Sequence, residues 1–135
     1  MAQASYPEEL LYHPEHDWAR VDDEGRGEAT LGITWYAQDA LGEVVFFDPP
    51  ALGSTLTKDD SYTEVESVKA VSDLYAPASG TVDEVNDDLT SAPEKVNSNA
   101  HSAWMMKITL SDPSEVNALM SAAEYEQYIA EEGGH

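Results

Sequence analysis

Cysteine is absent from the 135-residue chain. Its absence excludes disulfides, thiolate metal sites and a cysteine nucleophile. Any thiol chemistry in which the protein takes part must therefore be brought by a cofactor. The chain also lacks an apolar run of about 20 residues, the length needed to span a bilayer, and a basic, apolar leader segment. The sequence accordingly predicts a cytoplasmic protein with no membrane association.

Positive charge is scarce as well, with 6 Lys and Arg residues against 27 Asp and Glu, for a net charge of −21. A chain this acidic excludes nucleic acid as a natural partner, because binding to phosphates needs a basic surface. The charge favours a soluble monomer and can speed its encounter with basic patches on partner proteins. It is equally consistent with simple solubility or with life in high salt.

The motifs of an enzyme or a metal site are missing too. The chain contains no Gly-x-Ser-x-Gly elbow and no glycine-rich phosphate loop, and carboxylate pairs carry little information in so acidic a sequence. His13 and His16 lack a second pair of zinc ligands, so we interpret them as exposed or capping histidines. We expect the tryptophans in the core or at its rim, and we expect a protein that is not an enzyme and binds no metal.

What the chain does contain is a series of short β-prone segments. The apolar fraction of 41% and the length suit one domain over residues 1–135. Alternating apolar residues on either side of an Asp-Glu-Gly turn predict a hairpin over 17–33. A short helix is expected next, from its cap at Thr34 to its end at Gly42.

The later segments extend this pattern. The run 43–48 predicts a buried strand, stopped by two prolines, and two more strands flank Lys69. The polar stretch 86–102 is expected to be irregular. From Asp112 the tail is expected to be helical, with a break near Ser121. The order of elements predicts a mainly β fold: a flattened antiparallel barrel or sandwich with a short inserted helix and a C-terminal helical tail.

Lys69 is the lone cation of the segment 64–80, EVESVKAVSDLYAPASG. The strands predicted on either side place it at the tip of a hairpin, where it is exposed while its backbone is held. Such a position suits covalent attachment, because a modifying enzyme reaches the ammonium while the tip keeps one shape. On this argument alone, an ordinary solvated lysine remains the favoured alternative.

A resemblance to the glycine cleavage system H protein family, the lipoyl carriers, is carried by the strings GEATLGITWYAQDALGEVVFFDPPALGSTL and EVESVKAVSDLYAPASGTVDEVN. It extends from YHPEHDW through PEKVNSNAHSAWMMKI to the acidic tail, and so covers nearly the whole chain. The ESVKA motif, with SD and YAP after it, is the specific part. Biotin carriers are expected to show Met-Lys-Met at the tip, and lipoyl domains of 2-oxoacid dehydrogenases Asp-Lys-Ala. The fold implied is the hybrid type of lipoyl and biotinyl carriers.

The resemblance implies that Lys69 carries lipoate in amide linkage. Glu66 and Gly80 match family positions used in recognition for lipoylation, and we expect Gly80 to need a backbone conformation with positive φ. Asp17 and Asp73 match acidic residues of a surface cleft that receives the loaded arm. Charge-assisted hydrogen bonds would hold the protonated amine there.

The function implied is that of a non-catalytic carrier in glycine catabolism and one-carbon metabolism. The carrier would take an aminomethyl group from glycine decarboxylase (P protein) to aminomethyltransferase (T protein). It would pass electrons to dihydrolipoamide dehydrogenase (L protein), and a lipoate-attaching enzyme would modify it. The alternative is a lipoate-relay protein that supplies lipoyl groups to other enzymes. Both roles need Lys69 and the same recognition surface.

Two places depart from the family pattern. Tyr36 stands where the family often has histidine, so the resemblance does not carry a histidine contact over to the cleft. Ser102 and Ala103 stand where relatives tend to have glycine before the tryptophan, which predicts a stiffer loop.

Overall fold

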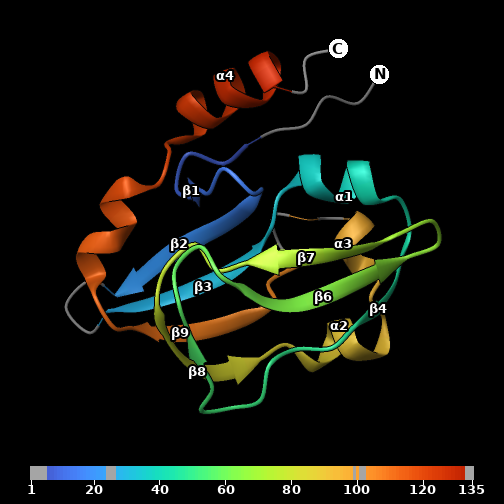
Figure 1. Ribbon diagram of the computed structural model, residues 1–135, viewed down its shortest axis with the longest axis horizontal. Coiled ribbons are helices and arrows are strands. Elements are labelled where there is room, and N and C mark those ends of the chain that lie inside the picture. Colours follow the sequence, from blue (N-terminus) through green and yellow to red (C-terminus); the bar gives the residue numbers. More distant parts are fainter. Residues whose placement is uncertain (1–5, 24–26, 99, 101–102, 133–135) are drawn as a thin grey trace.

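Two antiparallel sheets form the body of the protein (Figure 1). The computed structural model describes residues 6–23, 27–98, 100 and 103–132. The six-stranded sheet A has the order β1-β2-β3-β9-β8-β5, with strands Leu11–Tyr12, Asp17–Asp23, Glu28–Ile33, Met106–Leu110, Gly80–Val85 and Thr55–Leu56. The three-stranded sheet B has the order β4-β6-β7, with strands Val44–Phe47, Ser61–Ser67 and Val71–Tyr75. The prediction of a mainly β, antiparallel fold with few helices is confirmed.

The main core contains apolar side chains from both sheets. Leu31 and Ile108 of sheet A and Val65 of sheet B have no exposed surface, and Phe47 of β4 is 1% exposed. Because strand side chains alternate between faces, burial of each of these residues sets the register of its strand. This core therefore fixes how sheet B lies on sheet A.

The helix α1 (Trp35–Leu41) connects the two sheets, since it follows β3 and precedes β4. Its predicted ends are confirmed: the Thr34 side chain accepts a hydrogen bond from the Ala37 N–H, and Gly42 ends the helix with φ 80°. A second aromatic cluster holds the C-terminal helix α4 (Ala122–Glu132), whose Tyr125 ring stacks on Tyr12 at 4.8 Å between centroids.

Two local predictions were wrong. The stretch 86–102 was expected to be irregular but contains the short helices α2 (Asp87–Ser91) and α3 (Lys95–Ser98), anchored by buried Leu89 and Val96. Helices this short show no period in the sequence. The strand β4 is not fully buried, because Val45 and Phe46 are each 49% exposed.

The tail is helical with a break at Ser121, as predicted. It consists of a 3₁₀ helix, η1 (Pro113–Ala118), and α4. Ser121 and Glu124 cap α4 reciprocally, each side chain accepting from the other residue's backbone N–H. Glu115 of η1 accepts hydrogen bonds from the Ser79 N–H at 2.7 Å and the Ser79 hydroxyl at 3.2 Å, which holds the tail to the start of β8. No helix within the described ranges is long and apolar enough to cross a membrane.

The expectation of a positive φ at Gly80 was wrong. Gly80 is buried in β8, paired with Leu56 of β5 and Leu110 of β9, and it is not among the glycines with positive φ. A side chain is excluded there for another reason: a Cβ would overlap the backbone carbonyl of Thr109 and lie 3.0 Å from Ile108 Cδ1. Gly80 therefore permits close approach of neighbouring strands.

Gly80→Ala should lower the free energy of unfolding by about 1–3 kcal/mol, because the extra methyl overpacks a paired strand. The control is Gly53→Ala, at a turn where φ is 85° and nothing lies within 4 Å of an added Cβ. Any loss of stability in Gly53→Ala reports the cost of a side chain at positive φ without a steric overlap, whereas Gly80→Ala reports the overlap without a positive φ. Urea denaturation measures both variants, and a Gly80→Ala protein as stable as the unchanged protein would contradict the close-approach argument.

Candidate functional site

Lys69 lies in the short turn between β6 and β7, which Figure 1 shows at the right-hand edge. The turn is braced from inside: the Ser67 N–H donates to the Ala70 carbonyl at 2.7 Å, and the Ser67 hydroxyl accepts from the N–H groups of Ala70 and Lys69. The Val68 N–H donates to the Glu43 carbonyl at 2.9 Å, which ties the turn to the end of α1. The predicted hairpin tip is confirmed.

The Lys69 side chain is exposed and runs beside α1. Its Cε lies 3.2 Å from the point that a Cβ on Gly42 would occupy. The other three lysines have partners: Lys58 and Lys95 lie near carboxylates, and the Lys107 ammonium sits over the Trp104 ring. Among the described residues, Lys69 forms no ion pair. It is therefore an accessible amine on a turn of fixed shape.

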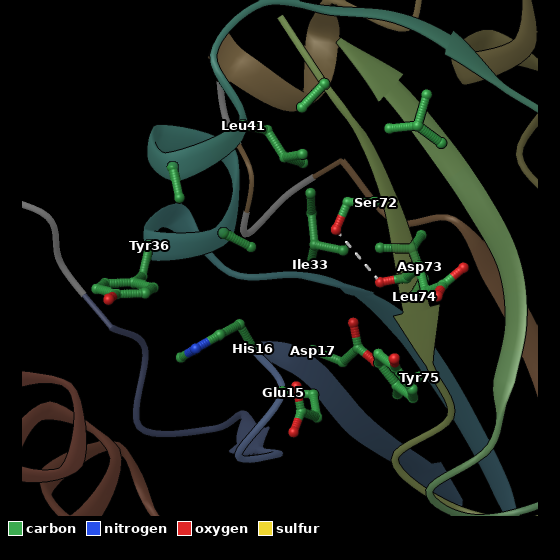
Figure 2. A pocket seen from close by; sticks show the side chains of 14 residues that line it. Glu15, His16, Asp17, Ile33, Tyr36, Leu41, Ser72, Asp73, Leu74 and Tyr75 are labelled. Atoms are coloured by element: carbon green, nitrogen blue, oxygen red, sulfur yellow. Dashed lines mark hydrogen bonds between the residues drawn. The ribbon is translucent and has the colours of Figure 1, made fainter. Parts of the chain in front are cut away.

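Next to the tip, a cleft of about 550 Å³ opens between α1, the segment that leads into β2, and β7 (Figure 2). β7 can form one wall because it is the edge strand of sheet B. The end near Lys69 is bordered by small or apolar residues of α1 and the start of β7. These are Ala37, Ala40, Leu41, Ala70 and Val71.

The two acidic residues proposed from the resemblance line this same cleft, although one comes from sheet A and the other from sheet B. Asp73 is exposed on β7. Asp17 is 1% exposed, and within the described part of the chain neither of its carboxylate oxygens has a hydrogen-bond partner. Burial raises the pKa of Asp17 well above its ordinary value, the negative charge of Glu15 raises it further, and an approach of the Tyr75 backbone, too poorly aligned to count as a hydrogen bond, lowers it by less.

A buried hydroxyl accompanies Asp17. The Tyr62 hydroxyl of β6 has no hydrogen-bond partner among the described residues. Burial raises the pKa of Tyr62 well above its usual range, and the charge of Asp17 adds to the rise. Two unsatisfied polar groups in the interior are costly. Such groups indicate a site built for something other than stability.

His16 also lines the cleft, and sequence reasoning did not find it. Its ring lies 4.5 Å from the Tyr36 ring, and its Nδ1 is 2.8 Å from the Tyr125 hydroxyl of α4. That hydroxyl is also 2.8 Å from Thr34 Oγ1, the cap of α1. His16 has φ 77°, a conformation that a residue other than glycine rarely adopts and that is common at functional sites. The cleft thus contains the imidazole of His16, which packs against the Tyr36 ring.

His13 is not exposed, contrary to one of the two expectations for it. It is 3% exposed, with Nε2 2.6 Å from Asp59 and Nδ1 accepting from the Glu15 N–H. The second contact lies within the turn between β1 and β2 and caps no helix. Among the described residues, no three His, Asp or Glu side chains come together as they would around a metal ion.

The remaining site residues lie apart from the cleft. Glu66 is exposed on β6, with Phe46 and Val71 as its cross-strand partners. Gly80 is buried in the other sheet. Ala103 is half-buried beside Trp104, away from the cleft, and Ser102 lies outside the described residues.

Comparisons with known proteins place nearly the whole chain in one family. The family model for the glycine cleavage H-protein matches residues 10–132. Glycine cleavage system H proteins of Koribacter versatilis and Acidobacterium capsulatum are 51% and 50% identical to the chain, over 97% of its length and 99% of theirs. The crystal structure of a glycine cleavage system H protein from Mycobacterium marinum has a TM-score of 0.81 and 32% identity, covering 94% of this chain and 98% of that one. The chain belongs to the glycine cleavage H-protein family.

Proposed function

We propose that the protein is the lipoyl carrier of a glycine cleavage system, with lipoate in amide linkage to Lys69. The observation that carries the proposal is the placement of an exposed amine, on a braced turn, at one end of a cleft that contains a buried carboxyl group with no hydrogen-bond partner in the described part of the chain. A lipoate-relay role would use the same turn, but it gives no reason for a buried acid in the cleft.

Lipoate, when attached, supplies the disulfide that accepts an aminomethyl group and electrons, which a chain without cysteine cannot supply itself. The partners proposed are glycine decarboxylase, aminomethyltransferase and dihydrolipoamide dehydrogenase, acting in the cytoplasm. The protein's own part is to hold and present the cargo. The chemistry of each step belongs to the partner enzymes.

The residues of the cleft fit such an arm. Apolar side chains border the end near Lys69, where an aliphatic stem would lie, and Asp17 and Asp73 line the same cleft. An ammonium on the cargo would give the buried Asp17 carboxylate the partner that it lacks. Such a charge-assisted bond is strong because the site is shielded from water. Keeping the amine protonated and dry would protect a labile cargo.

Lys69→Arg should abolish lipoylation, because a guanidinium does not form the amide. Incubation with a lipoate ligase, lipoate and ATP, followed by intact mass and peptide mapping, should give one lipoyl group on the unchanged protein. The matched control replaces Lys95, which is also exposed, on α3; the Lys95→Arg protein should gain one lipoyl group like the unchanged protein. A Lys69→Arg protein that still gains a lipoyl group would overturn the assignment of Lys69.

Asp17→Asn should stabilise the fold at neutral pH. Folded Asp17 keeps its proton above the unfolded pKa of about 3.9, so in that window the native state binds more protons than the unfolded state. The contribution of Asp17 to stability therefore falls as pH rises from the unfolded to the folded pKa. The stability gain of Asp17→Asn should grow over this window and then level off. Denaturation from pH 4 to 8 measures it, and a stability gain that does not change with pH would contradict the effect of burial.

Electrostatic steering of the carrier should weaken with salt. The Debye length falls from about 10 Å at 0.1 M to about 3 Å at 1 M, so a net charge of −21 should lose its effect on encounter with basic partner surfaces. We expect the apparent KM of glycine decarboxylase for the carrier to rise across this range, with turnover at saturation little changed. Uncharged lipoamide is the control, and an identical salt response would show that the charge serves solubility alone.

A further inference from the structure

The outer face of sheet B bears a row of three side chains next to the Lys69 turn. Phe46 pairs with Glu66, and Glu66 pairs with Val71, so the register puts all three on the same face of the sheet. All three are exposed, Phe46 at 49% and Val71 at 59%. The row lies directly beside the turn, because Val71 is the first residue after it.

Two more apolar residues extend this row into a patch. Val45 precedes Phe46 at a bulge in β4 and is 49% exposed, and Val68 in the turn itself is 72% exposed. Val45, Phe46, Val68 and Val71, here called the apolar collar, are four of the five large hydrophobic residues exposed in the described part of the chain; the fifth is Leu52. A concentration of this kind around one functional residue indicates a contact surface.

The charges beside the apolar collar are of one sign. Glu64 and Asp73 are directly opposite each other across β6 and β7, an arrangement that is unfavourable for like charges. Glu66 lies in the next row toward the turn. Within the described residues, none of these three carboxylates forms an ion pair. The free protein therefore leaves unbalanced negative charge here, which basic side chains of a partner would neutralise.

We propose that the apolar collar, with Glu64 and Glu66 beside it, is the docking surface for the enzyme that acylates Lys69. The partner's matching surface is apolar at its centre and basic at its rim. The inference rests on the proposed function, because it assumes that Lys69 is modified. It adds to that proposal the surface that the modifying enzyme reads, with Phe46 as the aromatic anchor.

The reach of the reaction selects this enzyme over the carrier's other partners. Acylation forms an amide bond between Lys69 Nζ and the lipoyl carbonyl carbon. The bond from that carbon to the activating group of an acyl adenylate or thioester breaks, and the nitrogen loses two protons. The reacting nitrogen lies at the end of a four-carbon side chain. The entrance of the enzyme's active site must therefore contact the turn and the residues beside it. Enzymes that act on the dithiolane work a whole acyl chain farther away and can dock elsewhere.

Phe46→Ala tests the proposal, with Leu52→Ala as the matched control at an exposed apolar site on another turn. The measurement is kcat/KM for lipoylation of the apoprotein by a lipoate ligase with lipoate and ATP, followed by intact mass. Removing an anchor of this kind costs about ten-fold or more, so Phe46→Ala should be slower by that factor and Leu52→Ala unchanged. Val71→Thr, which keeps the β-branched shape, should slow the reaction in the same direction.

A second readout separates docking of this enzyme from general damage. Phe46→Ala and Leu52→Ala proteins lipoylated to completion over long incubation should be oxidised and reduced by dihydrolipoamide dehydrogenase at the rate of the unchanged carrier. Equal lipoylation rates for Phe46→Ala and Leu52→Ala would overturn the docking surface, and so would a ten-fold loss with the dehydrogenase. If the unchanged protein takes up no lipoyl group at Lys69, it is the proposed function that fails.

Discussion

The apolar interface between the two sheets is the constraint on which the rest of the structure depends. Leu31, Val65, Phe47 and Ile108 lose essentially all their exposed surface there, and burial of such side chains is worth about 1.5–3 kcal/mol each. The strand order β4-β6-β7 leaves β7 at an edge of sheet B, and the packing of the two sheets places this strand across the cleft from α1 and the segment that leads into β2.

The cleft contains buried polar groups where a stable fold would favour apolar ones. The Asp17 carboxylate is buried without a hydrogen-bond partner among the described residues, and His16, at φ 77°, contacts Tyr36 and the α4 residue Tyr125. Strain and unsatisfied polar groups persist only where the surrounding structure over-determines them. The hydrogen bonds that link His16, Tyr125 and Thr34 supply part of that restraint. The C-terminal helix thereby braces the cleft, although none of its residues lines it.

One hairpin presents two different surfaces. The edge of β7 contributes to the cleft, where we place the cargo, and the outer face of β6 and β7 carries the row that we assign to the modifying enzyme. Val71 belongs to both, since it lines the cleft and ends the row. The turn at Lys69 is short and internally hydrogen-bonded, so the lysine has a fixed origin from which it can serve either surface.

The sequence by itself determined the mainly β class, the α1 caps, the hairpin tip at Lys69 and the family, because each follows from local pattern or a contiguous motif. It did not reveal α2 and α3, whose turns are too few to show a period, or the reason for Gly80, which is a clash with the neighbouring β9. The meeting of Asp17 with Asp73, the inclusion of His16 and the alignment of Phe46 with Glu66 were decided by tertiary structure alone. The first two depend on how sheet B and α1 pack against sheet A, and the third depends on the pairing register of β4 with β6; the side chains that the core buries set both.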